Sequence, residues 1–194
     1  MNTINYAVFP SIITEVFCDS YYTIRNSLID WIYQYQKTTN TVIFSNRGGW
    51  QSPSHFHEQE SFLEFKDFIL NNTYIALQYY NCDFKLSNMW ININKSGNYN
   101  TQHCHPKSIL SGVFWVKTSD NCGKLSFQSP NSFVEAPLLD SMDENIKKDQ
   151  NYYHTFDFCP QEGRIILFPS HLYHLVEPNE SDEDRISIAF NLNT

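Results

Sequence analysis

Three histidines and an arginine–serine pair are the residues of this chain whose types and spacing could support metal chemistry. His103 and His105 lie two positions apart in Gln-His-Cys-His-Pro, and His174 ends the stretch Phe-Pro-Ser-His-Leu-Tyr-His. Arg185 and Ser187 follow in Arg-Ile-Ser. Neutral imidazole binds Fe, Zn, Cu or Ni near pH 7, and arginine can hold a carboxylate through two parallel hydrogen bonds. These residues could therefore hold a divalent metal ion beside a dicarboxylate, if the fold brings them together.

The first two histidines are expected on one extended segment. Side chains two positions apart on a strand point to the same face, so His103 and His105 can reach one ion while Cys104 turns away. Taken alone, such a pair also fits a polar surface loop. The third histidine and the arginine, at a workable spacing, favour the metal site.

A predicted hairpin relates the third histidine to the arginine. If the strand that contains His174 pairs with the next strand, His174 lies opposite Ser187, and Arg185 lies one side-chain step along, about 7 Å away. A dicarboxylate that chelates the metal at one end would place its far carboxylate there. His171 competes for the ligand role, and this register is the reason to prefer His174.

The elements that must position these residues change character near residue 84. Apolar residues recur at three- and four-residue spacing over 20–36 and 58–80, which predicts two helices, with 71–72 as the point where the second could break. The glycines and proline of 47–53 predict a loop between them. After residue 84 the period becomes two, and short strands are predicted at 84–94, 109–117, 124–128, 152–158, 164–168, 173–177 and 185–192.

These strands predict the class of fold. Many short strands without intervening helices are typical of a barrel or a double-sheet jelly roll, here mainly β with helices at the N-terminal side. The polar segment 140–150 is expected to be a surface loop or a lid. We expect one domain over 1–194, in which a helical and loop region, 1–83, packs on a β core, 84–194.

The bulk composition excludes several classes of protein. Hydrophobic residues make up 41% and aromatic residues 16% of 194 residues, as in a folded, β-rich domain. The formal charge of −8 argues against binding of duplex nucleic acid, which needs a basic face. There is no apolar run of the ~20 residues that a membrane helix needs and no secretory signal pattern. The five cysteines, without a CxxC pair, predict reduced thiols and a cytoplasmic location.

The residues resemble a known family. The set is similar to the 2-oxoglutarate- and Fe(II)-dependent dioxygenases, on their prolyl-hydroxylase-like side. Within these it most resembles a group with four motifs: Gly-Gly-Trp-Gln-Ser (48–52), His-x-His-Pro (103–106), Leu-Ser-Gly (110–112) and Phe-Pro-Ser-x-Leu-x-His (168–174). The resemblance covers most of the chain, and the distal His…Arg-x-Ser is its most specific part. It implies a cupin-like double-stranded β-helix, Fe(II) and 2-oxoglutarate as cofactors, and hydroxylation with release of succinate and CO₂.

One departure from the family pattern concerns the second ligand. The usual triad is His-x-Asp/Glu…His, and here the middle position is His105. Three neutral ligands would leave the centre more positive by one charge. Three interpretations stay open: a three-histidine iron site, a carboxylate supplied from elsewhere such as Asp120 or Glu135, or a metal-poor relative that has lost turnover.

Further residues share a strand face or a loop with this set. Besides Arg185 and Ser187, the expected contacts of 2-oxoglutarate are Asn92, Ser111 and Asn191, and the expected contacts of the substrate are Trp50, Gln51 and Trp115. The loop histidines His55 and His57 are expected to be solvated or to face the substrate rather than to bind metal.

The sequence therefore predicts an Fe(II)- and 2-oxoglutarate-dependent oxygenase that hydroxylates an unidentified small molecule or protein side chain, with O₂ as cosubstrate. Two alternatives stay open. One is a cupin-like three-histidine dioxygenase or isomerase that uses no 2-oxoglutarate. The other is a non-catalytic jelly-roll module that binds a peptide or glycan.

Overall fold

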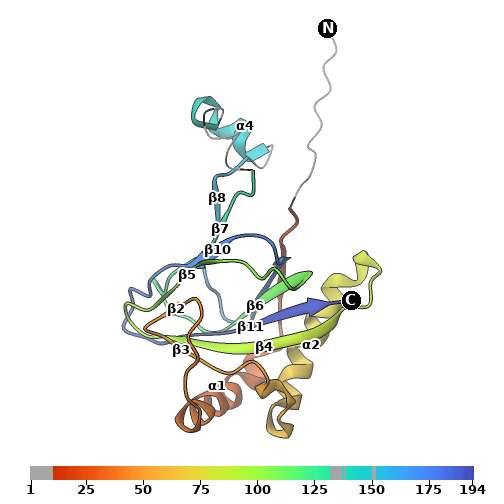
Figure 1. The fold of residues 1–194 in the computed structure, drawn as a ribbon, viewed down its shortest axis with the longest axis vertical. Coiled ribbons are helices and arrows are strands. Elements are labelled where there is room, and N and C mark those ends of the chain that lie inside the picture. Colours follow the sequence, from red (N-terminus) through yellow and green to blue (C-terminus); the bar gives the residue numbers. More distant parts are fainter. Residues whose placement is uncertain (1–10, 132–136, 138, 150–151) are drawn as a thin grey trace.

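Two antiparallel sheets and two flanking helices make up the body of the protein in the computed structural model, which describes residues 11–131, 137, 139–149 and 152–194 (Figure 1). The larger sheet has the order β1 (Thr14–Phe17), β9 (Arg164–Pro169), β6 (Leu110–Lys117), β11 (Arg185–Asn193), β4 (Lys85–Asn94) and β3 (Trp50–Gln51). The smaller sheet has the order β2 (Asn46–Arg47), β5 (Tyr99–His103), β10 (His174–Val176), β7 (Leu125–Gln128) and β8 (Thr155–Phe158). This is the double-stranded β-helix that the sequence predicted.

The strands expected after residue 84 are all present, with small shifts at their ends. The sequence did not predict β1, β2, β3 and β5. β2 and β3 contain two residues each, too few to show a period. β5 reads Tyr-Asn-Thr-Gln-His and has no apolar alternation, because its inner face is part of the polar site rather than of the core. That 1–194 forms one domain stays a prediction.

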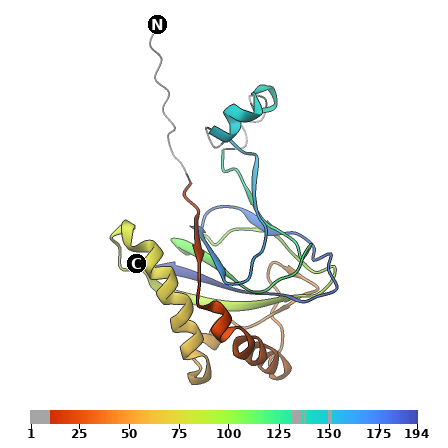
Figure 2. The ribbon, with the colours of Figure 1, turned by 180° about the vertical axis from the view of Figure 1, so that it is seen from behind.

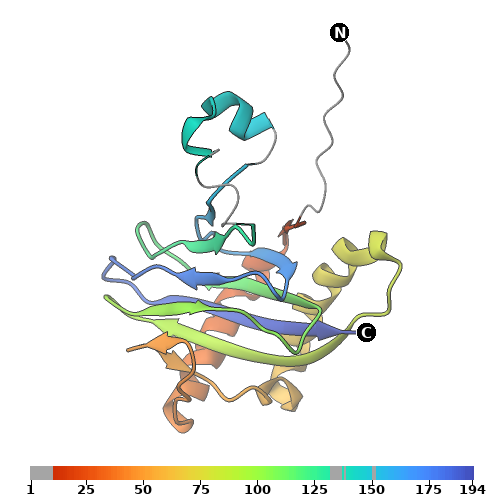
Figure 3. The same cartoon turned by 45° about the horizontal axis from the view of Figure 1, so that its top comes forward.

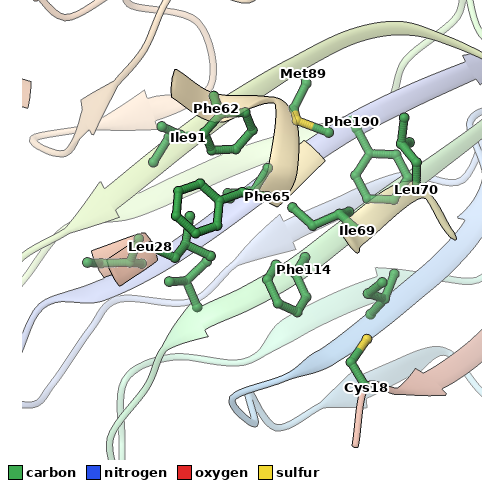
Figure 4. Packing of buried hydrophobic residues seen from close by; sticks show 14 of the residues in the cluster. Cys18, Leu28, Phe62, Phe65, Ile69, Leu70, Met89, Ile91, Phe114 and Phe190 are labelled. Carbon is green, nitrogen blue, oxygen red and sulfur yellow. The ribbon is translucent and has the colours of Figure 1, made fainter. Parts of the chain in front are cut away.

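Alternation along the larger sheet separates an apolar face from a polar one. On β11, Ile186, Ile188 and Phe190 point into the main hydrophobic core, while Arg185 and Ser187 point to the other side. Figure 4 shows the core packing of rings and aliphatic chains between this sheet and the helices. Each fully buried large apolar side chain contributes roughly 1.5–3 kcal/mol to folding. The fold thus fixes which face of β11 is left for the site.

The two helices cover the apolar face of the larger sheet (Figures 1 and 2). α1 (Tyr21–Thr38) buries Tyr21, Leu28 and Ile32 against it. α2 (Leu63–Leu77) is shorter than the helix predicted over 58–80 and runs unbroken through residues 71–72. The remainder of the predicted span forms 3-10 turns, η1 (Phe56–Glu58), η2 (Glu60–Phe62) and η3 (Gln78–Tyr80). No helix of the described residues combines the length and apolar composition that crossing a membrane requires.

The helical part of the connection between β7 and β8 that the structure describes stands away from both sheets (Figures 1 and 3). It contains a short helix, α4 (Glu144–Asp149), where the sequence predicted a surface loop or lid over 140–150. The helix has no buried residue, which agrees with the predicted surface location. Residue 150 lies outside the described residues, and a lid function stays a prediction.

Candidate metal centre

His103, His105 and His174 converge, as predicted. One ligand nitrogen from each histidine lies within 4.8 Å of the other two. The ring centroids of His103 and His174 are 4.4 Å apart, and those of His105 lie 5.2 Å from His103 and 5.1 Å from His174. His174 is buried, and the other two are half-buried. Three imidazoles at this spacing can share one metal ion.

Strand pairing in the smaller sheet places two of these histidines side by side. His174, the first residue of β10, is the direct antiparallel partner of His103, the last residue of β5. The pairing then shifts, because Val176 is opposite Asn100. Between the two pairs the chain advances three residues along β5 but only two along β10, so β5 contains a bulge. A bulge changes the face of the sheet to which the next side chain points. Both Asn100 and His103 can therefore face the interior.

His105 does not lie on the same strand as His103, in contrast to the prediction. β5 ends at His103, and His105 lies in the turn that follows. Its backbone N–H donates to the Ser170 carbonyl at 2.8 Å, and its own carbonyl accepts from the Ser108 N–H at 3.1 Å. The turn, rather than strand alternation, brings His105 back toward the other two rings.

Every one of the three rings is hydrogen-bonded at Nδ1. His103 Nδ1 lies 2.8 Å from the Thr101 carbonyl, and His174 Nδ1 lies 3.0 Å from the Leu172 carbonyl. A carbonyl can only accept, so Nδ1 carries the proton in both rings and Nε2 keeps its lone pair. This outer hydrogen bond orients a metal-binding imidazole and fixes its tautomer. The arrangement leaves Nε2 as the free ligand atom.

Burial keeps these histidines neutral. It lowers the pKa of His174 to about 3, with the neighbouring His103 as the next cause, and it lowers the pKa of His105 to about 4. Burial also lowers the pKa of His103. Neutral imidazole is the form that binds a metal ion, so the site is ready for a cation at pH 7.

The described residues offer no carboxylate to this group. The cluster of ligand atoms contains the three histidines and no Asp, Glu or Cys among the residues that the structure describes. Asp120, one of the two alternatives, is therefore not part of it, and Glu135, the other, lies outside the described residues. Among the interpretations left open by the sequence, the structure favours three neutral ligands.

Arg185 is buried without a partner for one edge of its guanidinium. It is 1% exposed, and Nε and Nη2 have no hydrogen-bond acceptor among the residues that the structure describes. Burial lowers its pKa to about 10, so it remains charged at neutral pH. Nε–H and Nη2–H point the same way and form the fork that matches a carboxylate. A buried, charged and unpaired fork of this kind fits an anionic ligand.

The predicted hairpin between His174 and Ser187 is wrong. His174 pairs with His103 and Phe127 in the smaller sheet, whereas Ser187 pairs with Asn92 and Trp115 in the larger one. The connection between β10 and β11 crosses from one sheet to the other. Its buried Asn179 donates to the carbonyls of Asn94 and Glu183 at 2.8 and 2.7 Å, which holds the crossing in place.

Comparisons with known proteins agree with this geometry. A family model described as "Putative 2OG-Fe(II) oxygenase" matches residues 88–191, which include all three histidines, Arg185 and Ser187. The chain belongs to this family. It is a 2OG-Fe(II) oxygenase, and Fe(II) and 2-oxoglutarate are its cofactors. Its reaction requires O₂ and a substrate. No curated protein matches the sequence.

Solved structures of 2OG oxygenases share the fold at low sequence identity. A prolyl-4-hydroxylase from Pseudomonas putida aligns with a TM-score of 0.63 and 12% identity over 93% of this chain and 91% of that one. A viral collagen prolyl hydroxylase from Paramecium Bursaria Chlorella virus-1, solved with 2OG, aligns with a TM-score of 0.59 and 14% identity over 93% of this chain and 94% of that one. HygX from Streptomyces hygroscopicus, solved with nickel and 2-oxoglutarate, aligns with a TM-score of 0.61 and 10% identity over 94% of this chain and 83% of that one. The family match gives no support to a cupin-like enzyme without 2-oxoglutarate or to a non-catalytic module.

A row of polar residues crosses the larger sheet of the oxygenase beside Arg185. Gln51, Asn92, Ser187 and Trp115 occupy directly paired positions on β3, β4, β11 and β6. Gln51 Oε1, Asn92 Oδ1 and Trp115 Nε1 are buried and have no hydrogen-bond partner. The larger sheet thus gathers unpartnered donors and acceptors next to the unpartnered guanidinium.

Two of the residues predicted to bind 2-oxoglutarate, Ser111 and Asn191, contact one of the three histidines, and their binding of 2-oxoglutarate stays a prediction. Ser111 Oγ and Asn191 Oδ1 are 2.8 and 2.7 Å from His105 Nδ1. Both lie on the inner face of the larger sheet, and Asn191 is four positions after Ser187 along β11. Besides His105, they contact each other, Asn88 and Ser170.

A cavity of about 780 Å³ opens beside the three histidines of the oxygenase. His103 and His105 lie in its wall, together with Asn88, Trp90 and Asn191 from the larger sheet. Trp90 shares a face with Asn92 by alternation along β4, but it is not among the residues that the sequence predicted for the site. The other lining residues come from the segments 42–55, 101 and 104–108.

Among the predicted substrate contacts, only Gln51 lines this cavity. Trp50 faces the helices, because its indole N–H donates to the Thr39 carbonyl at 3.1 Å and its ring packs edge-on against Tyr35. Trp115 is fully buried in a second apolar cluster with Phe127 and Phe168. Both tryptophans pack against other side chains and do not line this cavity, so a substrate contact of either one stays a prediction.

The two loop histidines, His55 and His57, differ in burial and in whether they line the cavity. His55 lines the cavity, as one of its two predicted roles required. His57 is buried next to Phe56, and burial lowers its pKa. Neither histidine belongs to the metal cluster.

Proposed function

We propose that the chain hydroxylates a C–H bond of its substrate with His103, His105 and His174 as the metal ligands and Arg185 and Ser187 as the anchor of the far carboxylate of 2-oxoglutarate. The observation that carries this proposal is the unpaired Nε/Nη2 edge of buried Arg185, in a family whose cosubstrate is a dicarboxylate. Three Nε2 lone pairs that face one another support the metal assignment.

The balanced reaction converts substrate C–H, O₂ and 2-oxoglutarate into substrate C–OH, succinate and CO₂. Bound Fe(II), with 2-oxoglutarate, supplies the activation of O₂. The side chains provide position. Arg185 and Ser187 fix one end of 2-oxoglutarate, and the three neutral imidazoles fix the centre from which the substrate is oxidised. 2-Oxoglutarate has only acceptor atoms, so Gln51 and Asn92, which are paired beside Ser187, can contact it through the N–H groups of their side-chain amides.

Three neutral ligands change the electrostatics of the centre. A carboxylate in the second position would neutralise one unit of metal charge, and His105 does not. The centre is then more positive by one charge and favours anionic ligands in the remaining positions. We infer that 2-oxoglutarate, with two carboxylates, supplies the charge that the protein lacks.

The wall of the cavity supports a proposal on the part of the substrate that faces the metal. Its lining contains the apolar groups Val42, Phe44, Pro53, Trp90 and Pro106. Although the chain has 21 acidic residues, the described lining contains no Asp or Glu. A cationic group would therefore lie there without an acidic partner and beside Lys107, which also lines the cavity. We propose that the substrate presents an apolar group without a positive charge, from a small molecule or a protein side chain.

Two further proposals concern partners and location. The net charge of −8 opposes association with duplex nucleic acid. Free cysteines at 18, 82, 104, 122 and 159 are consistent with a reducing compartment, and a cytoplasmic location is proposed on this basis. Fractionation of cells that express the chain at native level tests the location.

An anaerobic titration tests the assignment of the cofactor residues. Fe(II) and then 2-oxoglutarate are added to the protein, and the visible charge-transfer band of the chelate is recorded. We expect the band in the wild type, no metal binding in His174→Ala, and a much higher 2-oxoglutarate concentration for half-saturation in Arg185→Met. Arg25→Ala is the control, because Arg25 pairs with Glu162 at the surface of α1. A wild-type protein without the band, or an Arg185→Met variant with unchanged affinity, would refute the assignment.

The substrate-side proposal has its own test. Phe44, which is 74% exposed at the cavity, can be changed to alanine without loss of core packing. In the presence of a substrate found by screening, Phe44→Ala should raise the KM for that substrate and leave the 2-oxoglutarate KM unchanged. Equal effects on both values, or on neither, would count against a substrate contact.

A further inference from the structure

We propose that Asn191 and Ser111 are positioning residues that hold His105 as a metal ligand in place of the backbone carbonyls that hold the other two histidines. The inference rests on the proposed function, since it assigns a role relative to the proposed metal. Neither residue would touch the metal, 2-oxoglutarate or the substrate through this interaction. They act on His105 from behind, on the ring edge opposite Nε2.

Distances define a closed hydrogen-bond network at His105 Nδ1. Asn191 Oδ1 lies 2.7 Å and Ser111 Oγ 2.8 Å from this nitrogen. Ser111 Oγ donates to Asn191 Oδ1 at 2.7 Å, and Ser111 Oγ and Ser170 Oγ are 2.8 Å apart. Asn191 Nδ2 donates to Asn88 Oδ1 at 2.9 Å. The network therefore connects His105 to three side chains of the larger sheet and to Ser170.

The direction of the hydrogen bonds determines the tautomer of His105. The Asn191 amide nitrogen is engaged with Asn88, so its oxygen points to His105 and to Ser111. An amide oxygen accepts only, and the Ser111 hydroxyl hydrogen is already directed to the same oxygen. His105 Nδ1 must then donate, and Nε2 keeps the lone pair that a metal ion needs. The side chains select the tautomer that carbonyls select at His103 and His174.

The position of His105 explains why it needs side-chain support. The rings of His103 and His174 bond to the carbonyl two residues earlier, at Thr101 and Leu172. His105 lies in a turn after β5, and its ring reaches across to the larger sheet. There Asn191 is the direct strand partner of both Ser111 and Asn88. The paired strands β4, β11 and β6 thus form a rigid support for a ligand that comes from a turn.

Burial makes the network sensitive to substitution. Ser111 and Ser170 are fully buried and Asn191 is 6% exposed, so bulk water does not readily replace a lost partner. Loss of an outer-shell hydrogen bond to a metal-binding histidine typically lowers metal affinity 10- to 100-fold. We expect a decrease in this range for Asn191→Leu, which keeps the size of the side chain and removes both polar groups.

Metal affinity measured without 2-oxoglutarate or substrate tests the proposal. Co(II) is titrated into apoprotein, and the visible absorption of the bound ion gives affinity and the ligand environment. The variants are Asn191→Leu, Asn191→Asp and Ser111→Ala. Asn179→Ala is the matched control, because it removes a buried amide whose hydrogen bonds go to Asn94, Ser181 and Glu183 and to none of the three histidines. His105 in the wild type is assigned its tautomer by ¹⁵N NMR of the imidazole.

The proposal expects the Nδ1–H tautomer at His105, a 10- to 100-fold weaker Co(II) affinity in Asn191→Leu and a smaller decrease in Ser111→Ala. Asn191→Asp, which keeps an acceptor at Nδ1, should bind at least as tightly as wild type. If Asn191→Leu does not fold, the Co(II) affinity of Ser111→Ala and the tautomer of His105 in the wild type still test the proposal. Unchanged affinity in both variants, an equal decrease in Asn179→Ala, or an Nε2–H tautomer would overturn the proposal. Absence of Co(II) binding by the wild type would instead refute the proposed function.

Discussion

Replacing Arg185 by methionine should have opposite effects on ligand affinity and on the stability of the ligand-free protein. The guanidinium is fully buried, charged at neutral pH and unpaired at Nε and Nη2. Methionine keeps an unbranched side chain of similar reach and removes the charge. The change therefore separates the contribution of this group to binding from its contribution to folding.

The loss of affinity can be worked from the two free donors. Each charge-assisted hydrogen bond contributes roughly 1.5–3 kcal/mol, and truncating one partner of a buried, hydrogen-bonded charge pair typically costs about 2–5 kcal/mol. At 1.4 kcal/mol for each factor of ten, this corresponds to a 2-oxoglutarate affinity about thirtyfold to several thousandfold weaker. Arg185→Lys keeps the charge without the fork and should fall between the wild type and Arg185→Met.

The stability of the ligand-free protein should change in the other direction. A buried charge without a partner lowers the free energy of unfolding, and its replacement by an apolar group of similar volume is often stabilising by about 1–4 kcal/mol. Ligand-free Arg185→Met should therefore be more stable than ligand-free wild type. Saturating 2-oxoglutarate should reverse the order, since a ligand at 100 times its Kd stabilises by about 2.7 kcal/mol.

Urea unfolding of the Zn(II)-loaded protein, with and without 2-oxoglutarate, measures both effects in one experiment. Arg25→Ala again serves as the control. A less stable ligand-free Arg185→Met that still gains full stability from 2-oxoglutarate would show that the guanidinium is a structural group and not the carboxylate anchor.

Three more predictions follow from the same site and core. Lowering the pH from 7 to 5 should reduce the free energy of unfolding of the metal-free protein by about 1–2 kcal/mol for each of His105 and His174. The reason is that these histidines take up protons below about pH 6.5 in the unfolded state, but only near pH 4 and pH 3 in the folded state. Urea titrations that show no such loss would contradict the neutral state of the buried histidines. Zn(II) should raise the free energy of unfolding by about 2.7 kcal/mol at 100 times its Kd, and His174→Ala should abolish this increase; a variant that still responds fully places the ion elsewhere. Gly112→Ala should lower the free energy of unfolding by about 1–3 kcal/mol, because a Cβ there would overlap the Phe190 ring; equal urea midpoints would contradict the packing.

Local pattern was sufficient for the types and faces of most elements. Alternation predicted the strands from residue 84 onward and the inward direction of Arg185 and Ser187, because side-chain direction along a strand depends only on position. The pattern failed where an element is too short, as for β3, or polar on its inner face, as for β5. It did not show that Trp50 and Trp115 pack away from the cavity, because an aromatic ring has the same sequence pattern whether it packs in a core or lines a cavity.

The amino-acid sequence by itself was sufficient to predict the three histidines and the Arg185–Ser187 pair as site residues and to give the class of fold, since these inferences depend on side-chain chemistry and local periodicity. Only the tertiary structure decided that His174 pairs with His103 rather than with Ser187, because the partner of a strand is a long-range choice between sheets. It also decided that Asn191 lies within hydrogen-bonding distance of His105, and that Nε and Nη2 of buried Arg185 have no partner among the described residues. Each of these properties depends on contacts between segments far apart in the chain, and the strand pairing of the two sheets brings those segments together.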